Sequence, residues 1–214
     1  MQINKANISQ AVAHAVRELI VDGALGDGHS INEVSLAEKL GVSRTPLREG
    51  LGHLVADKIV TREARRGFFV APLTLEEFEQ LYDIRPLLDP EALRLAGIPA
   101  EKRLDRLDAL NRRLLDTKSP SKAIDLDNEW HTELLAHCPN RILLELIQQI
   151  IVRTRRYEYA LFRETKNVWV AGSEHQTIVT ALRNGDLRKA CAALKQNMCS
   201  GREPVKQWLQ ARAE

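Results

Sequence analysis

The pattern of the sequence changes near Pro72-Leu73, and this change constrains the fold more than any other feature. From about residue 75 onward, apolar residues recur at helical spacing, and Gly, Pro and Asn interrupt them. Before residue 72, short helical segments are followed by a strand-like ending. The pattern therefore predicts a mainly α-helical chain with a first domain over 1–72, a linker over 73–75 and a second domain over 76–214.

The second part of the chain consists of helical segments, each bounded by turn-forming residues. They are expected at about 74–96, 100–117, 120–137, 140–165, 168–183, 187–200 and 203–212. Thr74 and Glu77 have the S/T-x-x-E spacing of a capping box, which predicts that the first of these helices begins there. The second domain is therefore expected to be an all-helical bundle.

Composition argues against several classes of protein. The net charge is only +2, so charge alone does not indicate a nucleic-acid-binding protein. No stretch approaches the ~18 uninterrupted apolar residues of a membrane span, and the N-terminus lacks the apolar core of a signal peptide. Cys138, Cys191 and Cys199 are scattered, which argues against a disulfide framework or a thiolate zinc site. We therefore expect a cytoplasmic protein with no membrane partner.

Two short helical segments near the N-terminus are joined by a glycine. Ser35–Leu40 is the first segment, and Gly41 offers the left-handed backbone conformation of a tight turn. Ser43 is expected to cap the second segment with its hydroxyl, and Pro46 falls in its first turn, where a missing N–H does no harm. Backbone N–H groups at this helix start, together with Ser43 and Thr45, favour a phosphate.

The second segment carries arginines on the face opposite its apolar stripe. Leu47, Leu51 and Leu54 mark the buried side, whereas Arg44 and Arg48 are four residues apart and exposed. This arrangement is typical of a helix-turn-helix, whose second helix enters the major groove of DNA. We therefore predict that both arginines contact base edges or phosphates.

A hairpin with a basic tip follows this helix. Ile59–Arg62 and Phe68–Val70 have the composition of short strands, and Ala64–Gly67 joins them. Such a hairpin is typical of the wing of a winged helix-turn-helix. Arg65 and Arg66 at its tip are expected to be attracted by the negative potential of the minor groove.

These segments resemble a known family of regulators. Residues 36–49, LAEKLGVSRTPLRE, resemble the signature of the GntR family of bacterial repressors, and residues 65–70, RRGFFV, resemble its wing. The resemblance implies that six positions lie against DNA, namely Ser43, Arg44, Thr45, Pro46, Arg48 and Gly67. Gly50 and Lys58 depart from the family pattern, which usually has alanine and glycine there. Gly50 and Gly52 are expected to cost the helix about 1 kcal/mol each relative to alanine.

The second domain resembles the FCD domain of the FadR-like branch of this family, over about residues 76–205. The resemblance rests on Leu81–Arg85, on Asp127 with His131, and on Glu174-His175 followed by Asn184–Asp186. It implies an antiparallel bundle of six or seven helices that senses a small ligand.

Helical spacing brings candidate metal ligands together in this domain. Asp127 and His131 are four residues apart, so both project from one helix face. His175 lies 10 residues before Gly185 and Asn197 lies 12 after it. In an antiparallel hairpin with a rise of about 1.5 Å per residue, His175 and Asn197 reach the same level. Four groups from three helices then converge on one ion, although histidines that are only hydrogen-bonded in a core are the alternative.

The resemblance sharpens the prediction of a ligand site. Many FCD domains bind a divalent metal through one aspartate and three histidines, and Asn197 stands at the third histidine position. Zinc, nickel and manganese are the candidate ions. An amide oxygen is a poorer zinc ligand than imidazole and suits harder ions, so a zinc ion would be held weakly, manganese or nickel could take its place, and a site without metal is the alternative. In this family the metal often helps to bind a small organic acid. Arg85 is the expected partner of the carboxylate, with Arg153 and Arg156 as further candidates.

The function that these features predict is a transcription regulator, not an enzyme. A homodimer would place two winged helices on the half-sites of a palindromic double-stranded operator, and a metabolite would relieve repression. A metal-dependent enzyme is the leading alternative, with Asp127, His131 and His175 holding a catalytic ion. No nucleophile motif or general base accompanies that site in the sequence. A structural adaptor whose winged helix contacts protein is the third possibility.

Overall fold

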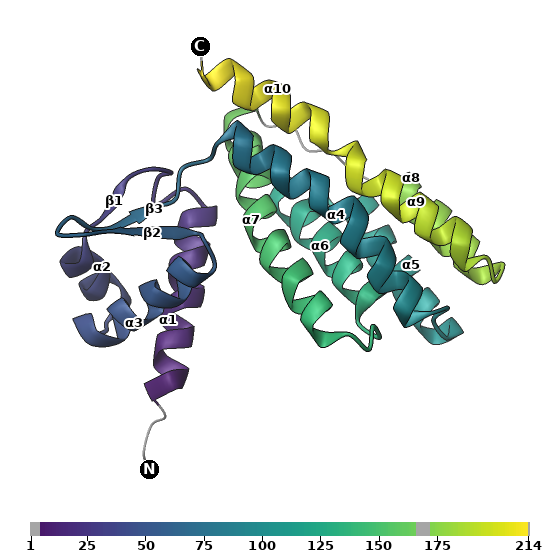
Figure 1. The fold of residues 1–214 in the computed structure, drawn as a ribbon, viewed down its shortest axis with the longest axis horizontal. Helices are drawn as coiled ribbons and strands as arrows, with labels where there is room; N and C mark the ends of the chain where they lie inside the picture. The colour runs from purple at the N-terminus through teal and green to yellow at the C-terminus, as the bar shows by residue number, and fades with distance from the viewer. Residues whose placement is uncertain (1–4, 166–171, 214) are drawn as a thin grey trace. The chain divides into compact units, whose positions relative to one another are not determined.

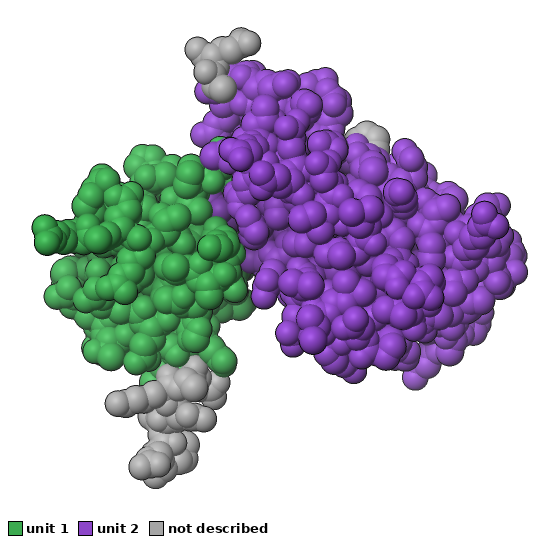
Figure 2. All heavy atoms as spheres, viewed as in Figure 1, with its two compact units in different colours: residues 1–73 green, residues 74–214 purple. Residues whose placement is uncertain are grey.

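The computed structural model describes residues 5–165 and 172–213, which divide into two compact units. Unit 1 spans Met1–Leu73 and unit 2 spans Thr74–Glu214 (Figure 2). Unit 1 is a small α/β unit, and unit 2 is helical. The fold class predicted from the sequence, mainly α with an N-terminal winged helix-turn-helix, is confirmed.

Three helices of unit 1 lie beside its small sheet, and their inward-facing apolar side chains are buried (Figure 1). They are α1 (Lys5–Val21), α2 (Glu33–Leu40) and α3 (Arg44–Ala56). Leu47, Leu51 and Leu54 of α3 are fully buried, as their spacing predicts, and α3 packs along α1, whose Val16 and Ile20 are also buried. This packing leaves the opposite face of α3, with Arg44 and Arg48, exposed.

The ends of α2 and α3 differ in part from the predicted ends. Gly41 ends α2 in the left-handed region with φ 65°, as expected. At the other end, the Asn32 side chain accepts hydrogen bonds from the N–H groups of Val34 and Ser35, so α2 begins at Glu33, earlier than predicted. The predicted hydroxyl cap on α3 is wrong, because Ser43 occupies the N-cap position without a side-chain capping bond.

A three-stranded antiparallel sheet completes unit 1. Its strands are β1 (Ser30–Ile31), β2 (Val60–Glu63) and β3 (Gly67–Val70), in the order β1-β3-β2. β2 and β3 form the predicted hairpin, with Val60 opposite Val70 and Glu63 opposite Gly67. Arg65 at the tip has a positive φ of 64°, and Gly67 has a φ of 96°. β1 was not predicted, because two residues are too few to show an alternating pattern.

Seven helices make up unit 2 within the described residues. They are α4 (Leu75–Ala96), α5 (Glu101–Asp116), α6 (Pro120–Leu135), α7 (Arg141–Thr165), α8 (Gly172–Arg183), α9 (Leu187–Ser200) and α10 (Arg202–Ala213). The predicted boundaries agree to within a few residues, and the predicted start of α8 at residue 168 lies outside the described residues. None of the described helices combines the length and the apolar character needed to cross a membrane.

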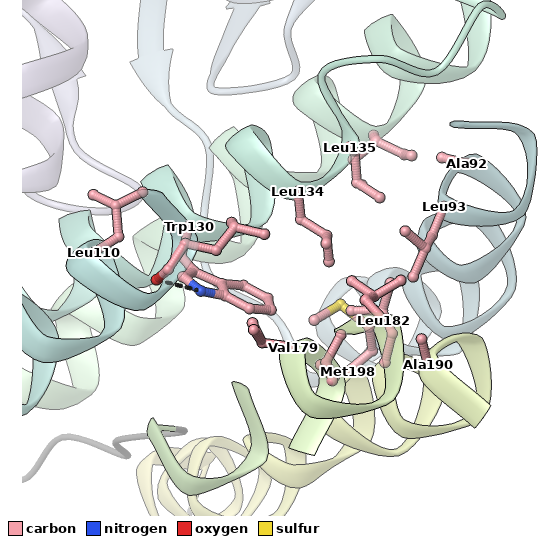
Figure 3. Close-up of a cluster of buried hydrophobic side chains, with 14 of the residues drawn as sticks. Ala92, Leu93, Leu110, Trp130, Leu134, Leu135, Val179, Leu182, Ala190 and Met198 are labelled. Atoms are coloured by element: carbon pink, nitrogen blue, oxygen red, sulfur yellow. Dashed lines mark hydrogen bonds between the residues drawn. The ribbon is translucent and has the colours of Figure 1, made fainter. Parts of the chain in front are cut away.

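The core of unit 2 is built around an indole ring. Trp130 of α6 is fully buried, and its Nε1 donates a hydrogen bond to the carbonyl of Leu107 over 3.1 Å. Leu134, Val179 and Met198 surround it, from α6, α8 and α9 (Figure 3). Because a buried indole N–H needs an acceptor, this bond fixes the ring in one orientation. The ring in turn supports the site described below.

Candidate functional sites

A positively charged groove lies on unit 1 between α3 and the wing. Its walls carry five arginines and two glutamates, with Ala64 and Gly67 at the tip; the charged residues are Glu33, Arg44, Arg48, Arg62, Glu63, Arg65 and Arg66. A surplus of arginine in a groove attracts phosphates. The structure thus brings together the predicted arginines of the helix and of the hairpin.

The remaining predicted DNA-contacting residues lie beside this groove. Ser43, Thr45 and Pro46 are at the start of α3 and do not line it. Ser43 and Thr45 are exposed, and Pro46 is partly exposed. They therefore occupy the helix N-terminus, where backbone N–H groups lack partners within the helix.

Three charged residues of the groove were missed by the sequence analysis, namely Glu33, Arg62 and Glu63. The guanidinium carbon of Arg62 lies 5.7 Å from the centre of the Phe68 ring, and that of Arg48 lies 6.0 Å from it. Glu33 forms an ion pair with Arg48, with 3.2 Å between Oε2 and Nε. The position of Arg62 in the strand before the basic tip was a signal that could have revealed it. No feature of the neighbouring sequence indicated a role for Glu33.

A second site lies inside unit 2, where α6 and α8 bring together the predicted metal-ligating residues Asp127, His131 and His175. Nε2 of His175 lies 3.3 Å from an Asp127 oxygen and 3.4 Å from Nε2 of His131. Nε2 of His131 lies 3.7 Å from the other Asp127 oxygen. Two atoms that each lie about 2.1 Å from one ion are about 3.0 to 3.4 Å apart. The three side chains therefore have the spacing of ligands to a single metal ion.

The His175 ring is held from two sides. It stacks on Trp130, with 3.8 Å between ring centres and 6° between planes. Its Nδ1 lies 3.2 Å from Oδ1 of Asn111, whose Nδ2 donates to the carbonyl of Gly172. Because the amide orientation is fixed in this way, Nδ1–H donates to Asn111 and the lone pair of Nε2 faces Asp127.

Asn111 was missed by the sequence analysis, although a signal was present. It is a buried amide next to the apolar stripe of α5, which includes Leu107, Leu110 and Leu114. A buried amide in such a position requires a polar partner. The partner is His175, the second histidine of the candidate metal site.

Asn197 of α9 lies in the wall of the same cavity as Asp127 and His131. Its Nδ2 donates to Glu174 over 2.7 Å, and Ser200 donates to the same carboxylate oxygen. Its Oδ1 is buried and makes no hydrogen bond within the described residues. An acceptor oxygen without a donor in such a place is suited to a cation.

Burial controls the charges of these ligands. Burial raises the pKa of Asp127 to about 7, and the Glu158 carboxylate adds to this rise. Burial lowers the pKa of His175 to about 3. Burial and the neighbouring His175 also lower the pKa of His131 well below its usual value. Both imidazoles are therefore neutral at neutral pH, which is the form that binds metals.

The cavity next to these ligands has about 690 Å³ of empty space, including its mouth. Its polar wall includes Tyr82, Arg85 and Glu158, and its apolar wall includes Ile124 and Leu161. Arg85 is the one positively charged residue in that wall, within the described residues. Arg85, predicted from the sequence to pair with an effector carboxylate, therefore lies in the wall of this cavity, and the pairing itself stays a prediction.

Arg85 is buried next to the oppositely charged side chain of Asp89. Its guanidinium donates to Asp89 over 3.0 Å, and Nε makes no hydrogen bond within the described residues. The further candidates Arg153 and Arg156 do not line the cavity. Arg153 donates to Glu77 at the start of α4 instead, over 2.9 Å from Nε.

Comparison with known proteins assigns both units to described domains. Residues 8–70 match the model of "Bacterial regulatory proteins, gntR family", and residues 80–198 match the model of the FCD domain. The chain is similar to the Nta operon transcriptional regulator of Aminobacter aminovorans, with 37% identity over 134 residues. That match covers 60% of this chain and 62% of the relative, which is less than two thirds of its length.

Two longer matches agree with this assignment. The uncharacterized HTH-type regulator BphR of Paraburkholderia xenovorans (strain LB400) is 25% identical over 215 residues, which cover 96% of this chain and 88% of BphR. The solved structure of E. coli McbR/YncC superposes with a TM-score of 0.76 at 21% identity, over 94% of this chain and 98% of that one. The Aminobacter and Paraburkholderia relatives are described as transcriptional regulators and not as enzymes, so the metal-dependent enzyme has no support among them. The chain belongs to the GntR family of bacterial regulatory proteins and carries the FCD domain of that family.

Proposed function

We propose that this chain is a sequence-specific transcription repressor that releases its operator when a small organic acid binds in unit 2. The observation that carries the proposal is the groove of unit 1, in which arginines of α3 and of the wing face the same space. α3 has the size and exposure to enter a major groove, where Arg44 and Arg48 reach base edges. Arg65 and Arg66 extend the contact toward the minor groove.

The start of α3 is suited to hold the phosphate backbone. The Ser43 hydroxyl does not cap the helix, so it is available to a phosphate oxygen. Thr45 and the backbone N–H groups of the first turn lie beside it. Pro46 and Gly67 are compact residues that allow the DNA backbone to approach.

A double substitution tests DNA recognition. Operator sequences are first selected from a random DNA pool with the wild-type protein. Arg44→Ala with Arg48→Ala is expected to abolish the preference for selected over bulk DNA. Arg112→Ala with Arg113→Ala removes the same charge from the exposed face of α5 and is expected to retain that preference. Unchanged discrimination by the α3 variant would refute the proposal.

We also propose that the protein acts as a homodimer on a palindrome. Regulators of the GntR family bind DNA operators and dimerise. A two-fold dimer presents two copies of α3 to half-sites about 34 Å apart, or a multiple of that distance. Sedimentation with a selected duplex is expected to give two chains per duplex, and a single chain per duplex would overturn this part of the proposal.

The effector site of unit 2 is proposed to contain a divalent metal. Asp127, His131 and His175 would hold it, and the unbonded Oδ1 of Asn197 supports a fourth contact. The amide oxygen and the carboxylate favour manganese, while the two imidazoles suit nickel as well as zinc. A bound divalent ion would supply positive charge beside the carboxyl groups of Asp127 and Glu158.

The positive charge of the ion would balance the negative carboxylate of an organic acid bound in the cavity. Arg85 is proposed to pair with the carboxylate of the effector, while Ile124, Leu161 and Val205 contact its apolar part. Arg85→Lys keeps the charge but loses the planar fork, so affinity for carboxylates is expected to fall while the Asp89 partner remains satisfied. A panel of small carboxylates, tested for release of the selected DNA, identifies the class.

Metal content tests the ligand set directly. Elemental analysis of the purified protein is expected to find about one divalent ion per chain. His175→Ala is expected to lose it, whereas His14→Ala, on the exposed face of α1, is expected to keep it. Equal metal content in both variants would contradict the proposed ligands.

A further inference from the structure

We infer that Glu33 is a positioning residue for DNA recognition: its carboxylate holds Arg48 in the orientation that meets the base edges. The inference rests on the proposed DNA-binding function and adds a residue to it. The predicted effect of the Glu33 carboxylate on DNA binding is unusual in its direction. An acidic residue in a groove for DNA is expected to strengthen specific binding.

Glu33 is held firmly at the start of α2. It is the first residue of the helix, directly after the Asn32 side chain that accepts two backbone N–H groups. Only 15% of the Glu33 side chain is exposed. Its Oε2 is buried and makes no hydrogen bond within the described residues, so the ion pair with Arg48 is the contact that compensates its charge.

Arg48 is held by groups from two further elements. Its Nε lies 3.2 Å from Oε2 of Glu33, and its guanidinium carbon lies 6.0 Å from the Phe68 ring centre on β3. Its side chain is still 48% exposed, so the remaining guanidinium N–H groups are open to a ligand. A long side chain that is already ordered loses less entropy on binding.

The other oxygen of Glu33 lies toward the wing. Oε1 is 4.0 Å from the position that a Cβ on Gly67 would take. Glu33 thus lies between α3 and β3, the two elements proposed to contact DNA. It fixes the guanidinium relative to both.

Simple electrostatics predicts the opposite, namely that the Glu33 carboxylate weakens binding to DNA. Phosphates are repelled by a carboxylate, so removing an acid from the groove should tighten binding to every sequence. If Glu33 positions Arg48, removing the carboxylate instead weakens binding to the selected sequence and relaxes the choice of base at the pair that Arg48 reads.

The groove offers a matched control. Glu63 lines the same groove and pairs with Arg66 at the wing tip. Its side chain is 44% exposed, and its partner is three residues away on the same hairpin. Glu63→Gln removes the same charge as Glu33→Gln without freeing Arg48. It frees Arg66 at the wing tip instead, so it is expected to retain the choice of base at the pair that Arg48 reads, whatever its effect on affinity.

The test measures full-length variants on selected and bulk DNA. Glu33→Gln is expected to lose about 10-fold in affinity for the selected duplex and none for bulk DNA. Glu33→Asp keeps the charge but is shorter by one methylene, so it is also expected to lose selectivity, which electrostatics does not predict. In an Arg48→Ala background, Glu33→Gln is expected to have no further effect.

The possible outcomes distinguish failure of this inference from failure of the proposed function. If wild-type protein shows no sequence preference, the proposed function itself fails. If wild-type protein discriminates but both Glu33 variants discriminate equally well, only the inference fails. Equal losses on selected and bulk DNA, or an undiminished loss in the Arg48→Ala background, would also refute it. Circular dichroism and melting temperature establish that Glu33→Gln is folded, and Glu33→Asp provides the test if it is not.

Discussion

Gly50 and Gly52 lie two positions apart in α3, but only Gly50 faces another helix. A Cβ on Gly50 would lie 2.8 Å from Val12 and 2.9 Å from the carbonyl oxygen of Ser9, both on α1. Nothing lies within 4 Å of a Cβ on Gly52. Gly50→Ala is therefore expected to lower the free energy of unfolding by about 1 to 3 kcal/mol, whereas Gly52→Ala raises it by about 0.5 to 1 kcal/mol.

Urea unfolding of the two variants measures this difference, and equal changes of the same sign would contradict it. The pair also shows what sequence can predict for a residue. Helix propensity assigns the same cost to both glycines, because it depends only on the helix itself. The close approach of α1 depends on how distant segments pack, and that was not available from the sequence.

Lys58 has a backbone conformation that explains why the family pattern usually has glycine at this position. Its φ is 61°, in the left-handed region where glycine is the usual residue. Lys58→Gly is expected to stabilise the protein by up to about 1 kcal/mol. Lys58→Ala removes the side chain but keeps the strain, so it is expected to give no gain. Thermal melting of both variants is the measurement, and a stabilised alanine variant would show that the side chain is responsible.

Asp127 is expected to make metal binding depend on pH. Its pKa of about 7 in the metal-free protein means that a metal must displace one proton at lower pH. Since burial lowers the pKa values of His131 and His175, both rings are already neutral in that pH range. Affinity for Mn²⁺ or Ni²⁺ is therefore expected to fall about 10-fold per pH unit below 7 and to level off above about 8.

Calorimetric titration from pH 6 to pH 8 measures this slope. Asp127→Asn removes both a ligand and the titrating proton, so it is expected to bind more weakly with little dependence on pH. Constant affinity across this range in the wild-type protein would contradict the prediction.

Among the elements, helices with long apolar stripes were predictable and helix ends were less so. The turn at Gly41 and the stripe of α3 follow from local spacing. The capping box predicted for α4 is only half present. Thr74 accepts from the N–H of Glu77, but the Glu77 carboxylate binds Arg153 and Tyr157 on α7. A partner 76 or more positions along the chain cannot be predicted from a four-residue motif.

The contact between α5 and α8 is expected to control the metal site through Asn111. Asn111→Leu fits the apolar stripe of α5 but removes the acceptor for Nδ1 of His175. Metal affinity is expected to fall 10- to 100-fold, roughly the effect of losing a partner that orients a metal ligand. Circular dichroism is expected to be unchanged, and metal titration is the measurement. Wild-type affinity in a folded variant would show that Trp130 alone orients the ring.

At the scale of the molecule, the division into two units was within reach of the sequence, whereas the meeting of Asp127 and His131 with His175 was implied by the family resemblance. Counting residues from the turn at Gly185 placed His175 and Asn197 at one level, and the order of segments together with the family resemblance pointed to a winged helix-turn-helix and a bundle. What sequence did not provide is polar geometry: the Asn111 contact, the Glu33 pair and the unbonded oxygen of Asn197. Each depends on side chains that packing brings together from different elements.

The proposed function requires a free-energy coupling between units 1 and 2, and such a coupling must be reciprocal. If a carboxylate weakens binding of the operator by about 20-fold, saturating operator must weaken binding of that carboxylate by about the same factor. Calorimetric titration of the carboxylate into protein with operator, with a scrambled duplex as control, tests this equality. Because the metal is proposed to hold the acid, chelation is expected to remove the effect of the carboxylate on the operator. A carboxylate that releases operator from metal-free protein would place the effector away from Asp127, His131 and His175.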